Sequence, residues 1–240
     1  MSTEERLERL ENELVALKQV VRTRALVVED ENGEICAVLT VDKDGSRLAL
    51  YDENGQRRAG LVVDKDGPNL ALYDENGKVR TGLVVKKEGH GLDLYDENGA
   101  PRAALGVTED GPVLTLIDDN GKGGAALTVL KGKGGPRMDL VDENGETRAW
   151  LGVGKDGPRM DLFDENGKAR AMLTVFKDGP GLTLADENGA PRAMLITVRG
   201  GPGLTLADEN VNARVQLAVG QDGPALRLGD DKGKIIWSAP

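Results

Sequence analysis

The residues best suited to chemistry in this chain are the carboxylates of its acidic turns. One kind of turn reads Asp-Lys-Asp-Gly, as at Asp42–Gly45 and Asp64–Gly67. Closely spaced carboxylate oxygens are ligands that Ca²⁺ prefers, but a calcium loop of the EF-hand type needs further oxygens and a distal Glu at fixed spacing. Those are absent, and copies such as Lys155-Asp156-Gly157 lack the first Asp. Turn formation explains the Asp and Gly, so we predict no cofactor and keep calcium binding as an alternative.

Other reactive side chains are few and scattered. His90 and Cys36 are the single histidine and the single cysteine. No nucleophile is repeated or clustered near His90, and serine is scarce, so a Ser-His-Asp arrangement is not indicated. One cysteine allows no intrachain disulfide, and Cys36 is interpreted as a small strand residue. A catalytic site usually breaks repeat symmetry, yet the irregular positions form no recognisable set: His90, Trp150, Trp237 and the 131–135 insertion. We predict that the protein is not an enzyme.

A second acidic turn, Asp-Glu-Asn-Gly or a close variant, recurs every 22 residues, with one step of 24. The ten copies begin at Asp30, Asp52, Asp74, Asp96, Asp118, Asp142, Asp164, Asp186, Asp208 and Asp230. A fixed period of this size marks a repeat architecture. Aromatic residues are only 3% of the 240 residues, so the apolar positions are filled by Ala, Val and Leu.

The charge and hydropathy of the chain limit its partners. The net charge of −10 argues against nucleic acid as a partner. No apolar stretch approaches the ~20 residues that span a bilayer, and the acidic N-terminus does not resemble a secretory signal. We therefore expect a cytoplasmic protein with no membrane span.

Residues 1–24 differ from the rest and predict an amphipathic helix over residues 3–23. Ser2 and Glu5 have the spacing of a capping box, and Glu5 and Arg9 form an i,i+4 pair. Apolar residues then follow a heptad pattern, which predicts an interaction face. That face consists of Leu7, Leu10, Leu14, Leu17 and Val21. Fewer than three heptads are marginal for an isolated helix, so we expect it to join an oligomeric bundle or to dock on the β structure.

Residues 25–240 alternate with a period of two, which predicts β-hairpins. Asn-Gly between alternating strands favours a two-residue type I′ turn, which at Asn54-Gly55 pairs Glu53 with Gln56 and Tyr51 with Arg58. The same register pairs Leu50 with Ala59 and Leu48 with Leu61. The second, longer turn pairs Val63 with Leu70 and Leu61 with Leu72. Both registers place the repeated Ala, Leu and Val on one face.

The opposite face is expected to carry a column of arginines: Arg58, Arg80, Arg102, Arg148, Arg170, Arg192 and Arg214. Four of them are predicted to oppose Tyr51, Tyr73, Tyr95 and Phe163, so that arginine stems pack on rings. A row that binds anions is the alternative interpretation.

Twenty strands are expected, from Leu26–Val28 to Ile236–Ser238. The chain begins and ends on half a repeat, which favours closure of the last strand on the first. A ring of twenty strands has a circumference of ~96 Å and a radius of ~15 Å, which one layer of Ala, Val and Leu cannot fill. The expected fold is therefore all-β: a closed antiparallel meander of about ten hairpins, preceded by one helix that could plug it.

The ten Asp-Glu-Asn-Gly hairpins resemble those of the β-flower fold, a shallow symmetric β-barrel with hairpin petals and an apolar channel. The resemblance covers residues 25–240 and implies an architecture without an established activity. The 24-residue step and the altered last turns depart from that symmetry. A weaker resemblance is to trimeric phage fibre shafts, in which short β repeats follow a coiled coil.

These patterns predict a non-enzymatic structural or scaffold protein that self-associates as a homo-oligomer, or docks, through its N-terminal helix. Changing Leu10 and Leu14 to Asp should then convert an oligomer to a monomer. The alternative function is a binding module for a lipid-like apolar molecule held in the channel. The residues predicted to line that channel are Ala59, Leu61, Val63, Leu70, Leu72, Leu83, Leu105, Leu127, Leu151 and Leu173.

Overall fold

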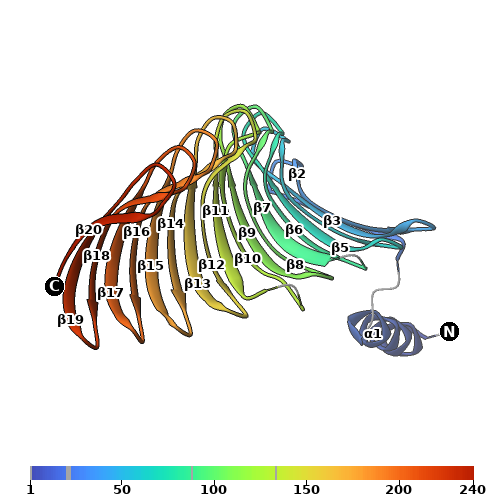
Figure 1. Cartoon of the computed structure of the whole chain (residues 1–240). Coiled ribbons are helices and arrows are strands. Elements are labelled where there is room, and N and C mark those ends of the chain that lie inside the picture. The colour runs from blue at the N-terminus through green and yellow to red at the C-terminus, as the bar shows by residue number, and fades with distance from the viewer. Residues whose placement is uncertain (1, 20–22, 88, 133) are drawn as a thin grey trace. The chain divides into compact units, whose positions relative to one another are not determined.

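The computed structural model describes residues 2–19, 23–87, 89–132 and 134–240. It is an all-β protein of antiparallel hairpins with one N-terminal helix (Figure 1). The chain divides into two compact units, Met1–Lys87 and Glu88–Pro240, which are called the N-terminal and C-terminal units below. No helix among the described residues is long and apolar enough to cross a membrane.

The N-terminal unit contains the helix and the first six strands. These are α1 (Thr3–Gln19), β1 (Ala25–Glu29), β2 (Ile35–Asp42), β3 (Gly45–Tyr51), β4 (Arg57–Asp64), β5 (Gly67–Tyr73) and β6 (Val79–Lys86). The C-terminal unit contains fourteen strands. These are β7 (Gly89–Tyr95), β8 (Pro101–Thr108), β9 (Gly111–Ile117), β10 (Gly124–Val129), β11 (Pro136–Val141), β12 (Thr147–Gly154), β13 (Gly157–Phe163), β14 (Ala169–Phe176), β15 (Gly179–Ala185), β16 (Pro191–Val198), β17 (Gly201–Ala207), β18 (Ala213–Gly220), β19 (Gly223–Gly229) and β20 (Ile235–Ala239).

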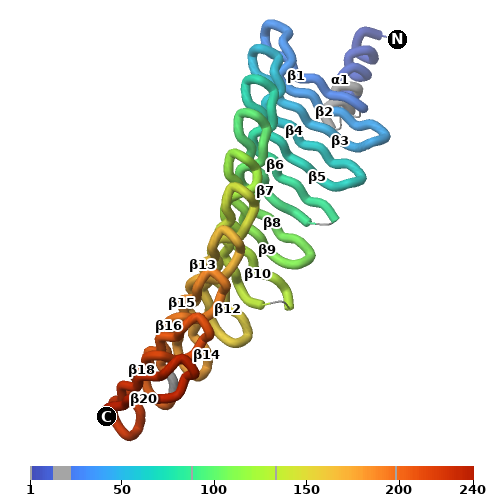
Figure 2. Tube along the Cα trace, turned by 45° about the horizontal axis from the view of Figure 1, so that its top comes forward, coloured from blue at the N-terminus to red at the C-terminus, as the bar shows by residue number. Residues whose placement is uncertain are grey.

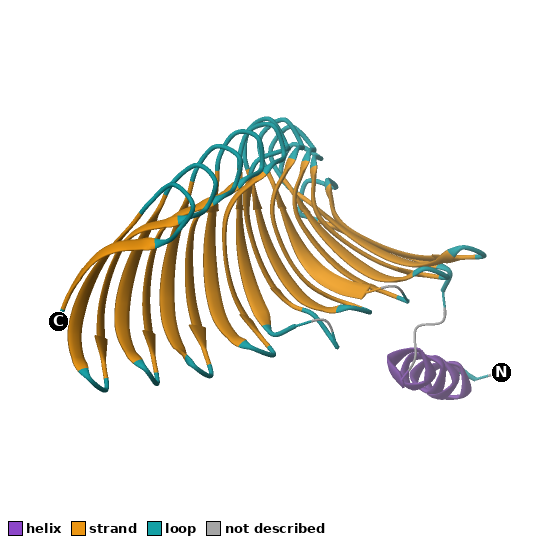
Figure 3. Cartoon of the chain, viewed as in Figure 1, coloured by secondary structure: helices purple, strands orange, loops and turns teal. Residues whose placement is uncertain are grey.

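Each strand within a unit pairs with the next strand along the chain, and every pair is antiparallel. Within each unit the Cα trace shows the hairpins in sequence order (Figure 2), and the turns gather at the two ends of the strands (Figure 3). The predicted meander of hairpins is therefore confirmed. Closure would require β1 to pair with β20. In the structure β1 pairs with β2 and β20 with β19, and the closed barrel stays a prediction.

The helix begins as the capping box predicts. The Glu5 amide donates to Ser2 Oγ at 3.2 Å, and the Ser2 amide donates to Glu5 Oε2 at 2.6 Å. These bonds satisfy amides that have no partner in the first helical turn. The helix extends to Gln19, whereas Thr23, the predicted last residue, is not helical. Val21 of the predicted interaction face lies outside the described residues.

The Asp-Glu-Asn-Gly turn differs from the predicted two-residue type I′ turn. The Gly55 amide donates to the Asp52 carbonyl at 3.0 Å, and the Asp52 amide donates to the Gln56 carbonyl at 3.0 Å. Gly55 has φ 71°, and no Asn of these turns has a positive φ in the described residues. The loop is thus the three-residue kind that ends in a left-handed glycine. The predicted pairing of Glu53 with Gln56 is wrong because this loop takes Glu53 out of the ladder.

A bulge next to this turn also changes the expected register. Leu50 pairs with Ala59 and Leu48 with Leu61, as predicted, but Tyr51 pairs with Arg57 rather than with Arg58. One extra residue on β4 is accommodated at this point, which is how a β-bulge re-aims side chains near a strand end.

The Asp-Lys-Asp-Gly turn is tighter than predicted. Asp64 pairs with Gly67 across two loop residues, so Leu61 pairs with Leu70 and Val63 with Pro68. The predicted pairings of Val63 with Leu70 and of Leu61 with Leu72 are wrong by two residues. A shift of two preserves the face of every side chain, and the pairing of β5 with β6 begins only at Asn69, after the proline that has no amide hydrogen to donate.

Neither unit contains a conventional hydrophobic core. Ala185 is the one buried hydrophobic side chain among the described residues, and Asp161 is the one buried charged side chain. Backbone hydrogen bonds between neighbouring strands, rather than packing between layers, connect the elements that the structure describes.

Candidate functional site

The main candidate surface is the apolar face of the strands in each unit, made of three rows that run across the strands. The pairing registers align these rows from strand to strand. Over most strands the first row alternates Ala and Leu, the second is Leu or Met, and the third alternates Val and Pro. On β12 and β13 the rows read Ala149 and Leu162, Leu151 and Met160, and Val153 and Pro158.

All predicted channel-lining residues lie in these rows. Ala59, Leu61, Val63, Leu70, Leu72 and Leu83 lie on the apolar face of the N-terminal unit, and Leu105, Leu127, Leu151 and Leu173 lie on that of the C-terminal unit. The exposed fraction of these leucines ranges from 38% for Leu70 to 56% for Leu105. A role as the lining of a channel stays a prediction, because it depends on closure of the sheet.

The apolar face of the C-terminal unit has a shallow concavity of about 170 Å³. Met138, Leu140, Leu151 and Met160 are among its lining residues. The two methionines replace leucines of the second row, and their flexible thioethers suit an irregular apolar surface.

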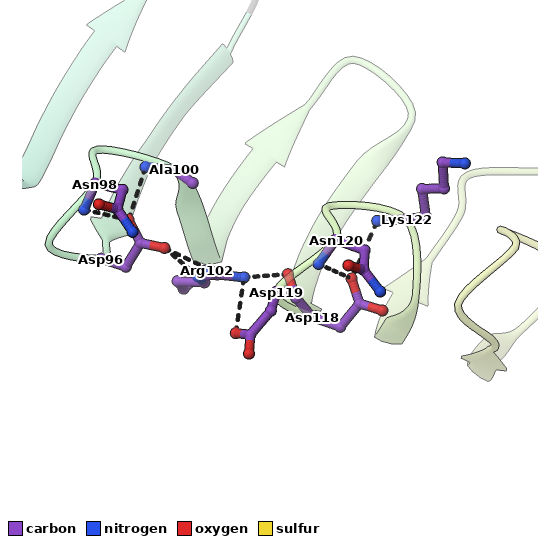
Figure 4. Close-up of polar contacts among 8 residues, drawn as sticks. All are labelled: Asp96, Asn98, Ala100, Arg102, Asp118, Asp119, Asn120 and Lys122. Carbon is purple, nitrogen blue, oxygen red and sulfur yellow. Dashed lines mark hydrogen bonds and ion pairs between the residues drawn. The ribbon is translucent and has the colours of Figure 1, made fainter.

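The Asp-Glu-Asn-Gly end of the strands carries a column of ion pairs. The first Asp of each turn accepts two backbone amides: Asp96 Oδ1 accepts from Asn98 at 2.8 Å and from Ala100 at 2.9 Å. The other oxygen, Asp96 Oδ2, accepts from Arg102 Nε at 2.7 Å. The same guanidinium also donates to the Asp118 carbonyl and pairs with Asp119 at 3.2 Å, so it joins one turn to the next (Figure 4).

This arrangement repeats along both units. Each arginine of the predicted column pairs with the turn aspartate six residues before it. The pairs are Arg58–Asp52, Arg80–Asp74, Arg102–Asp96, Arg148–Asp142, Arg170–Asp164, Arg192–Asp186 and Arg214–Asp208. Because each guanidinium already has a carboxylate partner, the column is a poor anion site.

Hydrogen bonds to the turn aspartates lower the pKa of most of these carboxyl groups. For Asp164 the largest cause is the Lys168 amide, and Arg170 and the Asn166 amide lower its pKa further. The pKa of Asp96 is lowered chiefly by the Ala100 amide, with Arg102 and Asn98 contributing. Donors that favour the ionised form have this effect on any carboxyl group.

The predicted packing of the arginine column on aromatic rings needs correction. Tyr73 pairs with Val79, Tyr95 with Pro101 and Phe163 with Ala169, because the bulge displaces each arginine by one position. The cation over Tyr73 is instead that of Arg57, with Cζ 5.0 Å from the ring centroid.

One cluster on the face opposite the apolar face breaks the repeat. Trp150 on β12 lies between two arginines of the neighbouring strands, with Arg137 Cζ at 5.1 Å and Arg159 Cζ at 5.7 Å from its ring. Asp139 accepts from Arg137 Nε at 2.7 Å and Asp161 from Arg159 Nε at 2.8 Å. Every charge in the cluster is therefore paired, which is typical of a structural network.

The remaining irregular residues do not join this cluster. His90 pairs with Val107 on β8, and Trp237 pairs with Leu228 on β19. Cys36 is exposed and unpaired with another cysteine. In the part of the chain that the structure describes, no three His, Cys, Asp or Glu side chains gather as metal ligands.

The described part of the predicted helix face is open to solvent. Leu7 and Leu10 are 59% and 57% exposed. Leu14 and Leu17 lie within α1.

Two features of the site were not expected from the sequence. The sequence does not indicate that the arginine column pairs with the turn aspartates. It marks Trp150 as an irregular position but does not indicate the arginines and aspartates around it. Placing residues 137, 150 and 159 on adjacent strands by their phase in the repeat is the signal that would have found the cluster.

Comparison with known proteins identifies no family. No family model and no curated protein matches the sequence. Among solved structures, that of TcdB2-TccC3-TEV is 12% identical, with 91% of this chain and 15% of that chain covered and a TM-score of 0.21. TcdB2-TccC3 is 14% identical, with 93% and 14% covered and a TM-score of 0.22. A putative 6-phosphogluconolactonase from Bacteroides uniformis is 10% identical, with 87% and 82% covered and a TM-score of 0.18. These low scores carry no argument about function.

Proposed function

We propose that the chain is a non-enzymatic structural repeat protein that acts by assembly. The observation that carries this proposal is the apolar face of each unit, whose leucines and valines remain about half exposed. Soluble monomers rarely expose contiguous apolar patches beyond a few hundred Å², and larger patches mark interaction sites.

The free energy available from covering this face is substantial. Complete burial of a Leu or Val side chain contributes about 1.5–3 kcal/mol, so a half-exposed one leaves about 1 kcal/mol to be gained. The face repeats such side chains on every strand, which gives an assembled form a large advantage over an isolated chain.

The N-terminal helix is the second assembly element of the proposal. Its exposed Leu7 and Leu10 belong to the heptad face, which a short bundle of helices would cover. Native mass spectrometry of the full chain should give the mass of two or more copies of the 25.5 kDa chain.

A double variant, Leu7→Asp with Leu10→Asp, should lower the number of copies if the helix contributes. Glu8→Gln with Glu11→Gln on the polar positions is the matched control and should leave the mass unchanged. A wild-type protein that is monomeric at every concentration tested would refute assembly as the function.

Closure into a β-flower-like ring is the alternative to assembly, in which the apolar face is covered within one chain. It would place the apolar face around a channel and join β1 to β20. The apolar residues of both end strands support it, since Leu26 and Val27 are 46% exposed and Ile236 is 65% exposed, and such edges are usually covered or paired. A cysteine pair at Val28 and Trp237, which both lie in the first apolar row, should crosslink within one chain of a Cys36→Ser variant if the ring closes.

Binding of a lipid-like molecule is the second candidate function. It is favoured by the concavity that Met138, Leu140, Leu151 and Met160 help to line, because ligand sites are lined predominantly by apolar side chains. Native mass spectra should then contain excess mass that disappears on denaturation, and protein that never carries such mass would count against this function.

A further inference from the structure

We infer that the apolar face of the C-terminal unit is covered by the same face of a second copy of this chain. The inference deepens the proposed assembly function and rests on it, because it names the partner and the surface. It starts from the first row of the face, which alternates large and small side chains across the strands.

The alternation is regular over eleven consecutive positions aligned by the strand pairings. The row reads Leu94, Ala103, Leu116, Ala125, Leu140, Ala149, Leu162, Ala171, Leu184, Ala193 and Leu206. Neighbouring strands are ~4.8 Å apart, so leucine ridges and alanine grooves repeat every ~9.6 Å.

A second copy has the same ridges and grooves at the same spacing. Displaced by one strand, it places its leucines over the alanines of the first copy, and the match continues across the whole row. Stacked sheets pack ~10 Å apart with interdigitated side chains and keep their strands within ~30° of one another. A partner with another period would lose the match within a few strands, which is why the occupant is a second copy.

Charge and area are both compatible with this interface. The three rows of the unit contain no Asp, Glu, Lys or Arg, so facing copies do not repel each other. The exposed large residues of the rows are 22 Leu, Val and Met side chains between Leu94 and Leu228. At half of the ~60–120 Å² that full burial of each removes from water, they supply roughly 1,000 Å², which exceeds the ~800 Å² per partner of a standard stable interface.

The opposite face does not offer an equivalent surface. It carries the paired charges around Trp150, and its large exposed side chains are few, Ile196 being 42% exposed. Adjacent residues of β16 therefore give a matched pair of variants: Leu195, 51% exposed, lies on the apolar face, and Ile196 lies on the other.

The experiment measures self-association of the full chain by sedimentation velocity in the Leu7→Asp, Leu10→Asp background, which removes association through the helix. Dimers should persist in that background. Leu195→Arg should raise the dissociation constant at least ~100-fold, because a twofold interface buries two unpaired charges. Ile196→Arg should change it less than ~3-fold, and circular dichroism should show that both variants keep their strands.

A second variant distinguishes interdigitation of the two faces from unspecific apolar association. Ala149→Leu with Ala171→Leu makes the face more apolar but fills two grooves. Interdigitation predicts weaker dimers, by ~10-fold or more, whereas an unspecific apolar surface predicts stronger ones, and that result would overturn the inference.

The remaining outcomes separate this inference from the function on which it rests. Loss of the dimers in the Leu7→Asp, Leu10→Asp variant, with no effect of Leu195→Arg on dimers of the chain with its wild-type helix, would refute the second copy on this face and leave assembly through the helix. A chain that is monomeric in every form would refute both. Intrachain crosslinking of β1 to β20 in a monomer would assign the face to a channel instead.

Discussion

At the scale of single residues, the turn glycines show how strictly the repeat fixes its sequence. The last residue of the Asp-Glu-Asn-Gly turn has a positive φ in each repeat, and the ninth copy has Val211 there, with φ 63°. A β-branched residue pays about 1–2 kcal/mol in this region of backbone space.

Replacing Val211 with Gly should therefore stabilise the protein by about 1 kcal/mol, after allowing for the greater freedom of glycine in the unfolded chain. The half-exposed Val211 side chain has little packing to lose. Chemical denaturation measures the change. Gly189→Val, at the same turn position of the preceding repeat, should destabilise by a similar amount, and a destabilised Val211→Gly protein would contradict the turn geometry.

A second glycine position is constrained by its neighbour rather than by its turn alone. Gly157, with φ 125°, faces the Val175 carbonyl, and an added Cβ would overlap that oxygen. Gly154, which pairs with it across the same hairpin, has nothing within 4 Å of an added Cβ.

Gly157→Ala should therefore cost about 2 kcal/mol or more in the free energy of unfolding, whereas Gly154→Ala should be within about 0.5 kcal/mol of wild type. Thermal unfolding of the two variants side by side gives the comparison. Equal stabilities would show that the close approach of neighbouring hairpins is relaxed in solution.

At the scale of the hairpin, the column of Arg–Asp pairs connects one repeat to the next, as the Asp164 turn shows. Asp164 accepts the amides of Asn166 and Lys168 and pairs with Arg170 at 3.1 Å, while Arg170 Nε donates to the Ala185 carbonyl at 3.0 Å. This turn is thus capped internally, and Arg170 connects it to the end of the strand that precedes the next turn.

This geometry gives stability a defined pH dependence. The pKa values of turn aspartates such as Asp74, Asp96, Asp142, Asp164 and Asp186 are lowered in the folded state. Their contribution is therefore complete above the unfolded pKa of about 3.9 and is lost as the pH falls through the folded values. These groups should therefore leave the melting temperature nearly unchanged between pH 7 and about 5. Below about pH 4 the melting temperature should decrease.

Asp164→Asn keeps an oxygen acceptor but removes the charge, so it should lower stability at pH 7 and by less at pH 3. Glu165→Gln removes the same charge from the same turn and should have little effect at either pH. Equal effects of the two variants would mean that net charge, rather than the Asp164 contacts, governs acid stability.

At the scale of the whole molecule, the unusual property is a sheet whose apolar face is left open. A domain normally buries such a face against a second layer, and in the described residues Ala185 alone qualifies as a buried hydrophobic side chain. We therefore expect the native mass of the wild-type chain to exceed 25.5 kDa at micromolar concentration. The distribution of masses over a dilution series would measure that preference directly.

The sequence by itself determined the features that depend on local periodicity. The capping box at Ser2 and Glu5, the twenty alternating strands and the face on which Leu61, Val63 and Leu70 lie follow from residue type and spacing. A period of two fixes the face even where the register is wrong by two residues, which is why the apolar rows were predicted although Leu61 pairs with Leu70 and not with Leu72.

Only the tertiary structure decided the features that depend on small backbone shifts and on neighbouring strands. The left-handed Gly55, the bulge beside Arg58 and the two-residue loop before Gly67 changed the register. The bulge moved the arginine column from aromatic rings to the aspartates of the turns, and strand pairing brought Arg137 and Arg159 to Trp150 from outside its own strand. Such contacts depend on loop geometry and on how neighbouring strands pair, and no local pattern encodes which of several equally spaced hairpins a side chain will meet.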